Sequence, residues 1–180
     1  TLRVLEAARA AGVKRVVYAS SSSAYGDTPT LPKVETMPTR PLSPYAVAKL
    51  TGEHYARVYA RVFGLETVSL RYFNVFGPRQ DPDSAYAAVI PKWIGAMLAG
   101  EPVYINGDGE TSRDFTYIDN VVDANLNAAR AAREPEGLVC NIACGERVSI
   151  LDLIERINGI LGTNVEPVFI ESRAGDVKHS

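Results

Sequence analysis

A tyrosine and a lysine four positions apart stand out in the stretch SPYAVAKLTGEHY. Tyr45 and Lys49 follow Ser43 and Pro44, a pair typical of a helix N-cap and the first helical position. On a helix, residues four apart lie on one face. A lysine ammonium close to a phenol favours the phenolate, and such a tyrosine can take or give a proton near neutral pH. The spacing alone does not exclude a chance pairing, so the surroundings of the pair decide its weight.

Polar side chains follow two predicted strands, RVVYASS and ETVSLRYF. The serines Ser20–Ser23 come at the end of the first strand, and Asn74 follows the second. Ligands of open α/β sheets gather at the carboxyl ends of strands. Hydroxyl and amide groups there can donate to a substrate and accept from it. The alternative for the serines is a turn that bonds only to its own backbone.

Arginines and a glycine-rich segment supply further candidate ligands. Guanidinium groups match phosphate geometry, and the candidates are Arg71, Arg79, Arg113 and Arg173. A single loop arginine is more often only a solvated charge. The segment VYINGDGETSRD predicts a tight loop that closes over a base, or else a plain hairpin turn.

The composition is that of an ordinary globular protein. The 180 residues are 46% hydrophobic and 22% charged, with a net charge of −2. This balance gives no global attraction to nucleic acid or to an anionic membrane, so neither is expected as a partner. No apolar run approaches the ~20 residues that span a bilayer.

Two cysteines, Cys140 and Cys144, lie in the segment CNIAC. On a strand they would be about 13 Å apart, too far for a disulfide. Neither histidine is near them in the sequence, so we expect no metal site. We expect two reduced, buried thiols in a cytoplasmic protein.

Predicted helices and strands alternate along the chain. Helices are expected over 2–11, 44–64, 83–100, from a cap at Asp119 to about 132, and from Ser149 to 162; further strands are expected over 103–107, 113–117, 137–143 and 165–171. This alternation predicts an α/β fold with a largely parallel sheet, with a boundary near Asp81. A Gly-rich dinucleotide-binding turn of the G-x-G-x-x-G type is missing from the sequence.

Together, SPYAVAK, the serine run, RYFNVFGPRQDP and GDGETSRDF closely resemble the extended short-chain dehydrogenase/reductase family. Within its NAD-dependent epimerase/dehydratase branch the resemblance is closest to UDP-N-acetylglucosamine 4-epimerases. It implies a Rossmann-like doubly wound parallel sheet without its first strands, and a small irregular α/β substrate domain. Residues 1–80 would form the second half of the NAD-binding domain. Residues 81–180 would form mostly the nucleotide-sugar domain, with segments returning to the sheet. The chain lacks an initiator Met and the Gly-rich half, so both ends are expected to be truncated.

The resemblance also implies roles for individual residues. Tyr45 would be the catalytic acid/base, Lys49 its partner and a ligand of the nicotinamide ribose, and Ser21 the catalytic serine. The other residues implied to bind NAD or the UDP-sugar are Ser20, Tyr72, Ser22, Ser23, Asn74, Gln80, Ala88, Tyr104, Ile105, Asn106, Arg113, Arg173 and Ser180. Arg113 and Arg173 would bind the diphosphate, and residues 104–106 would flank the uracil. Ala88 and Ser180 are small, which would leave room for an N-acetyl group.

The implied reaction is NAD-dependent 4-epimerisation of a UDP-sugar through a 4-keto intermediate. The expected sugars are UDP-N-acetylglucosamine and UDP-N-acetylgalactosamine, and also UDP-glucose and UDP-galactose. A nucleotide-sugar 4,6-dehydratase is one alternative, but the family's dehydratases carry Asp and Glu where this chain has Ser22 and Ser23. A non-catalytic nucleotide-sugar-binding fragment is the other alternative. The resemblance also implies a homodimer, formed through a helix bundle of Leu2–Ala11 and Ala46–Phe63.

Overall fold

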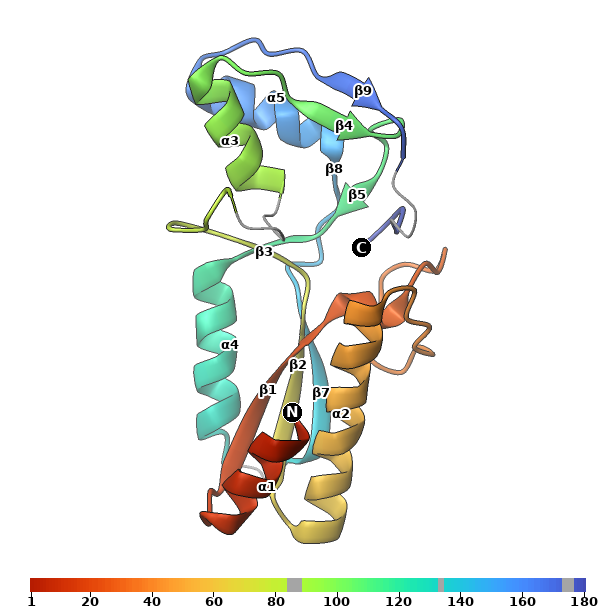
Figure 1. Ribbon diagram of the computed structural model, residues 1–180, viewed down its shortest axis with the longest axis vertical. Helices are drawn as coiled ribbons and strands as arrows, with labels where there is room; N and C mark the ends of the chain where they lie inside the picture. The colour runs from red at the N-terminus through yellow and green to blue at the C-terminus, as the bar shows by residue number, and fades with distance from the viewer. Residues whose placement is uncertain (84–88, 133–134, 173–176) are drawn as a thin grey trace.

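The computed structural model describes residues 1–83, 89–132, 135–172 and 177–180. Its lower half is a three-stranded parallel sheet in the order β1-β2-β7 (Figure 1). β1 (Arg15–Ser21) pairs with β2 (Glu66–Tyr72), which pairs with β7 (Glu136–Ile142). Because the strands are parallel, their carboxyl ends meet at one edge, where Tyr72 has Ser21 and Ile142 as its neighbours. The predicted α/β fold with a parallel sheet is confirmed.

Helices cover both faces of this sheet. α2 (Pro44–Phe63) packs against all three strands on one face, and α4 (Ile118–Arg130) lies on the other (Figure 1). α1 (Leu2–Ala10) packs on α2, where Leu5, Tyr59 and Leu65 form a small core.

α2 begins and ends as its sequence predicts. The Ser43 hydroxyl accepts a hydrogen bond from the Ala46 amide at 3.2 Å, and Pro44 occupies the first turn. Gly64 ends the helix in the left-handed conformation, with φ at 69°. In the middle of the helix, a Cβ on Gly52 would lie 2.1 Å from the Tyr18 hydroxyl. α2 therefore approaches β1 more closely than any larger residue would allow.

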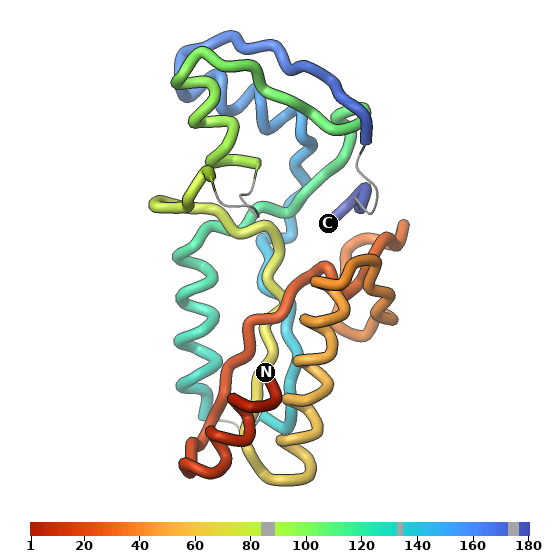
Figure 2. Tube along the Cα trace, viewed as in Figure 1, coloured from red at the N-terminus to blue at the C-terminus, as the bar shows by residue number. Residues whose placement is uncertain are grey.

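The upper half has a separate core. α3 (Val89–Ala99) and α5 (Ile150–Leu161) pack on short strands, and Trp93, Met97 and Ile105 are buried between them. β4 (Tyr104–Asn106) pairs with β9 (Val168–Ile170), β5 (Ser112–Arg113) with β8 (Val148–Ser149), and β3 (Asn74–Phe76) with β6 (Phe115–Tyr117). The chain passes between the two halves at 73–76, 115–118 and 142–148 (Figure 2). The carboxyl edge of the sheet therefore faces the upper half.

Two predictions differ from the structure, and one alternative is excluded by it. α4 begins at Ile118 with Tyr117 as its N-cap, so the predicted cap at Asp119 is wrong; Asp119 lies in the first turn, where its carboxylate favours the positive end of the helix dipole. The segment 103–113 is not a hairpin, because β4 and β5 pair with different partners.

Cys140 is half-buried in β7, but Cys144 is exposed, so the prediction of two buried thiols is wrong for Cys144. Both thiols are free.

The described part of the chain contains no candidate for a membrane span or for a metal site. None of its helices is long and apolar enough to cross a membrane. Its His, Cys, Asp and Glu side chains form no group of three that could hold a metal ion.

Candidate active site

Three small cavities are each lined by Phe73 or Asn74, the residues that directly follow β2. The first has a volume of about 170 Å³ and is lined by six predicted site residues: Ser21, Ser22, Ser23, Tyr72, Asn74 and Ser180. Its wall also includes Lys33, which the sequence did not single out. The structure thus gathers residues that are more than 150 positions apart in the chain around one cavity.

The serine run bonds locally and also lines the cavity. Ser21 caps the short 3-10 helix η1 (Ser22–Tyr25), because its hydroxyl accepts from the Ser23 amide at 3.2 Å. The Ser23 hydroxyl donates to the same oxygen at 2.9 Å. The serines therefore do form a turn that bonds to its own backbone, which the sequence left open as the alternative to a ligand site. This turn also holds the three hydroxyls at the cavity wall.

The second strand contributes Tyr72 and Asn74. The Tyr72 hydroxyl donates to the Asn125 side chain of α4 at 2.9 Å. The Asn74 amide donates to the backbone oxygens of Asp114 at 3.0 Å and Ser180 at 3.3 Å. Both side chains are therefore fixed in place, and Asn74 ties the tail residue Ser180 to the cavity.

The second cavity, of about 210 Å³, is lined by four residues expected to bind the UDP-sugar: Asn74, Ile105, Asn106 and Arg113. Ile105 is buried in the upper core, whereas Tyr104 is about half exposed and does not line this cavity. Neighbouring residues of a strand point to opposite faces, so β4 presents Tyr104 and Ile105 to different surroundings.

The third cavity, of about 220 Å³, lies next to the other two, because it shares Lys33 and Ser180 with the first and Arg113 with the second. Basic side chains form part of its wall. Arg113 donates to the backbone oxygens of Ser112 and Lys178, at 2.9 and 3.2 Å. Arg147 donates to the Ser112 hydroxyl at 2.9 Å.

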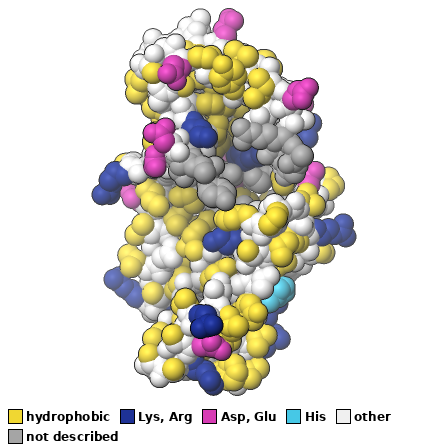
Figure 3. Space-filling view, in the orientation of Figure 1, with side chains coloured by type: hydrophobic (Ala, Val, Ile, Leu, Met, Phe, Trp, Pro, Cys, Tyr) yellow, Lys and Arg dark blue, Asp and Glu magenta, His cyan; other side chains and the backbone are white. Residues whose placement is uncertain are grey.

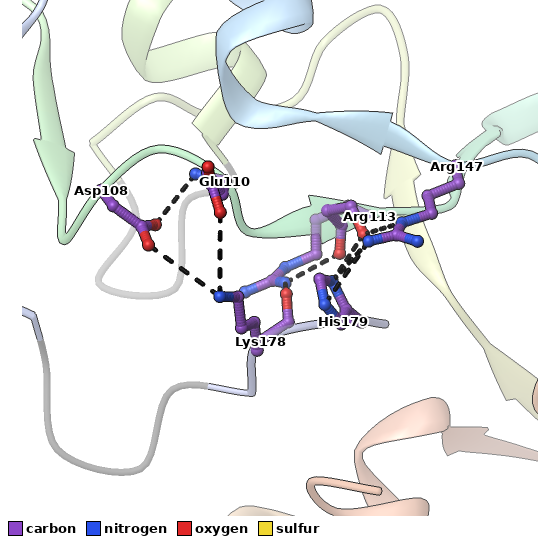
Figure 4. A network of polar contacts seen from close by, with 7 residues as sticks. Asp108, Glu110, Arg113, Arg147, Lys178 and His179 are labelled. Carbon is purple, nitrogen blue, oxygen red and sulfur yellow. Dashed lines mark hydrogen bonds and ion pairs between the residues drawn. The ribbon is translucent and has the colours of Figure 1, made fainter. Parts of the chain in front are cut away.

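His179 also lines the third cavity, whereas its neighbour Lys178 does not (Figure 4). Burial, and then the charge of Arg147, lower the pKa of His179. Lys178 forms long ion pairs of 3.9 Å with Asp108 and Glu110, both of which are exposed. Besides His179, the described wall of the third cavity contains three basic side chains, Lys33, Arg113 and Arg147, and two carboxylates, Asp114 and Glu146. The basic side chains outnumber the acidic ones, which suits an anionic ligand.

Tyr45 and Lys49 lie together at the first turns of α2, but line none of these cavities. The Lys49 ammonium lies 5.6 Å from the centre of the Tyr45 ring and donates to the Ala19 backbone oxygen at 2.9 Å. The Tyr45 side chain is half exposed. The lysine thus bridges the end of β1 and the tyrosine, and the tyrosine ring is open to a ligand.

Two predicted ligands are placed differently. Ser20 is buried, and its hydroxyl donates to Glu53 of α2, so its side chain does not face the cavities. Arg71 is also buried and donates to both oxygens of Glu53, at 2.7 and 2.8 Å, so the prediction that it clamps a phosphate is wrong. These side chains instead bind α2 to the ends of β1 and β2.

Comparison with known proteins identifies the family. Residues 1–143 match the NAD dependent epimerase/dehydratase family. The chain belongs to this family. It is 41% identical to a UDP-glucose 4-epimerase of Mycolicibacterium smegmatis, a match that covers all of this chain and 57% of the relative. The chain spans little more than half the length of such family members.

Two solved structures of family members are also similar. A UDP-N-acetylglucosamine 4-epimerase from Methanobrevibacter ruminantium, in complex with UDP-N-acetylmuramic acid, is 42% identical with a TM-score of 0.94; the match covers 99% of this chain and 57% of that one. A UDP-glucuronic acid 4-epimerase from Bacillus cereus, in complex with UDP-glucuronic acid and NAD, is 38% identical with a TM-score of 0.89, covering 99% and 55%.

Other candidate residues lie apart from this site or outside the described structure. Gln80 lines a larger cavity of about 730 Å³ between α3, α5 and residues 76–82, and so does Arg79. This cavity is mostly apolar and lacks the serines and Asn74. Although this cavity is larger than the other three, it lacks the residues implied to act on the sugar, so we do not assign the reaction to it. The predictions for Ala88 and Arg173 fall on residues outside the described structure.

The sequence reasoning missed Glu53 and Lys33. Tyr45, Lys49 and Glu53 are each four residues apart, so they lie on one face of the helix. The spacing that singled out Tyr45 and Lys49 could therefore also have identified Glu53. Lys33 lies in the loop between Gly26 and Ser43, which has no periodic pattern. Only the folded loop brings it to the serines.

Proposed function

We propose that the complete enzyme epimerises a UDP-sugar at C4 with bound NAD. The observation that carries this proposal is that Ser21, Tyr72 and Asn74 line one cavity. Tyr45 and Lys49 lie beside the end of β1, the strand that Ser21 ends. Family membership and the UDP-sugar 4-epimerases among its relatives support it.

The residues at the start of α2 suit the nicotinamide-ribose end of NAD. Lys49 uses one of its three ammonium protons on Ala19, so two donors are left for ribose hydroxyls. The half-exposed Tyr45 ring lies next to it. We propose these two residues, with Tyr72, as the cofactor ligands within this chain; Ser20 is left out because Glu53 occupies its hydroxyl.

The protein's own groups would move the proton. Tyr45, as phenolate, would take the proton of the sugar 4-hydroxyl, and Ser21 would act as a relay between them. NAD, when bound, supplies the acceptor and later the donor of the C4 hydride. Between these steps the keto sugar turns about its diphosphate link, so Tyr45 must return the proton to the same oxygen from the opposite face of the ring.

The remaining subsites follow from the neighbouring cavities. Arg113 and Arg173 would bind the diphosphate, and residues 104–106 would flank the uracil. Ser22, Ser23 and Asn74 would bind the sugar; Gln80 is left out because it lines the separate cavity between α3 and α5. Ser180 lines the first and third cavities with a small side chain, which supports a sugar with an N-acetyl group, as in UDP-N-acetylglucosamine and UDP-N-acetylgalactosamine. Ala88 would be the second small wall residue.

The wider setting is part of the same proposal. Residues 1–80 and the returning segment 118–142 would complete an NAD-binding domain, and most of 81–180 the substrate domain. On the face seen in Figure 3, hydrophobic side chains are spread over both halves, and β1 is an edge strand of the sheet. Val4 on α1 and Val58 and Val62 on α2 are half exposed or more, which supports a dimer through these helices. The proposed location is the cytoplasm, in keeping with the free thiols.

Tyr45→Phe tests the proposal, with Tyr55→Phe on the same helix as the matched control. Both changes remove one phenolic hydroxyl from an exposed or half-exposed side chain of α2. In the complete enzyme, Tyr45→Phe should lower the turnover of UDP-glucose or UDP-N-acetylglucosamine by about 10²–10⁴-fold, the usual worth of general acid–base catalysis. Tyr55→Phe should leave turnover within about threefold of wild type.

Equal turnover of the two variants would contradict the role of Tyr45. Products are identified by chromatography: a 4-epimer supports the proposal, whereas loss of water from the sugar would point to the dehydratase.

A further inference from the structure

Lys33 is a buried lysine that the proposed mechanism does not use. It is 9% exposed, and β7 holds its backbone, because the Asn141 amide donates to the Lys33 oxygen at 2.9 Å. The Asn141 backbone amide donates to Glu35 at 2.8 Å, and Tyr25 donates to the Asn141 side chain at 2.7 Å. The loop around Lys33 is therefore fixed to the sheet on both sides of Val34.

The ammonium of Lys33 has little compensation inside the protein. It donates to the backbone oxygen of Thr28. In the described part of the chain, no carboxylate forms an ion pair with it. Burial lowers the pKa of Lys33, and the charge of Asp27 offsets this in part. A lysine ammonium can donate three hydrogen bonds, so this charge has donors to spare.

Lys33 stands in the wall of the first cavity together with Ser21, Ser22 and Ser23. Asn74 adds an amide to the same wall, and the described lining includes no acidic residue. A cavity with one buried positive charge, several hydroxyls and no carboxylate favours a ligand that brings the negative charge itself.

We infer that Lys33 binds an acidic substituent on the sugar, so that the site takes UDP-sugars whose ring carries a carboxylate. The inference rests on the proposed function, because it assigns the first cavity to the sugar. Diphosphate is the other anion of such a substrate, and Lys33 also lines the third cavity together with Arg113. We assign Lys33 to the carboxylate because the described lining of the first cavity contains Lys33 and the serines without an arginine, and UDP-glucose, which carries the same diphosphate, tests this assignment.

UDP-glucuronate and UDP-glucose make the test, because they differ only in a carboxylate in place of the hydroxymethyl group at C5. The complete enzyme should bind UDP-glucuronate at least about tenfold more tightly by isothermal titration calorimetry, and kcat/KM should show the same preference. Lys33→Met should abolish this preference and leave UDP-glucose binding within about threefold of wild type. Lys178→Met, which removes the same charge from an exposed side chain, should keep the preference.

Lys33→Gln serves as a second neutral variant, because it can still donate to Thr28 if Lys33→Met folds poorly. Lys33→Arg keeps the charge and should retain the preference. Equal affinity of the wild type for both sugars overturns the inference, and so does a preference that survives in either neutral variant. If no UDP-sugar is epimerised, the proposed function fails, whereas the calorimetric comparison still decides the role of Lys33.

Discussion

The buried pair of Glu53 and Arg71 predicts a strongly non-additive pair of mutations. Their side chains are 2% and 4% exposed, and Arg71 donates to both carboxylate oxygens, at 2.7 and 2.8 Å. The Arg71 guanidinium also stacks 4.6 Å from the centre of the Tyr25 ring. Although burial alone would lower it, the hydrogen bonds and charge of Glu53 raise the pKa of Arg71. A guanidinium is not deprotonated in proteins, so Arg71 stays charged even when its partner is removed.

Glu53→Met should accordingly cost about 3–5 kcal/mol of unfolding free energy, as should Arg71→Met, because each leaves a buried charge without its partner. At about 2–4 °C per kcal/mol, each single variant of the complete enzyme should melt roughly 6–20 °C below wild type. The double variant replaces the pair by two apolar side chains of similar length, so it should recover most of this loss.

Differential scanning calorimetry of wild type, both single variants and the double variant closes the thermodynamic cycle. Lys178→Met is the control for an exposed ion pair, and because its partners are exposed it should move Tm by no more than about 1–3 °C. If the losses of the two single variants simply add in the double variant, the cost does not come from an unpaired buried charge. The reasoning would then be refuted even if each single variant is unstable.

Two further perturbations have expected outcomes. Gly52→Ala should cost about 1–3 kcal/mol of stability and lower turnover, because its Cβ would meet the Tyr18 hydroxyl at 2.1 Å and push the helix that carries Lys49 away from β1. Gly95→Ala is its control, because no atom lies within 4 Å of the added Cβ. In chemical denaturation its free energy of unfolding should rise by up to about 1 kcal/mol. Equal effects of the two substitutions would disprove the close approach of α2 to β1. Ser180→Tyr should cut kcat/KM for UDP-N-acetylglucosamine at least about tenfold and spare UDP-glucose, and equal losses on both sugars would show that Ser180 does not limit the pocket.

Regular elements were predictable where local chemistry alone determines them. The N-cap at Ser43 is present, and Ser149 forms a full capping box with Asp152 at the start of α5. Strands β1 and β2 appear within a residue or two of their predicted bounds, because runs of β-branched and apolar residues suit a buried parallel strand. The error at Asp119 has a local cause as well: an acidic residue favours the first turn as much as the cap, and β6 leads directly into α4.

The assembly of the site was only partly predictable. Ser21 and Tyr72 both end predicted parallel strands, so their meeting follows from the sheet, and the register places them side by side. The buried ion pair of Arg71 could not be predicted from the sequence, because an arginine can serve either as a phosphate ligand or as a member of a buried ion pair. What decides is whether its strand position faces the cavity or the helix, and alternation along β2 turns Tyr72 and Arg71 to opposite faces.

Glu53 links the stability of the fold to the geometry of the site. The stripe Tyr45, Lys49 and Glu53 lies on one face of α2, and its two lower members bind the strands: Lys49 through Ala19, and Glu53 through Ser20 and Arg71. These contacts fall on the last residues of β1 and β2, directly below the serines and Asn74. The helix therefore cannot slide by one turn along the sheet without breaking a buried ion pair. This fixes the position of Tyr45 along the sheet relative to Ser21, which the proposed proton relay between the two requires.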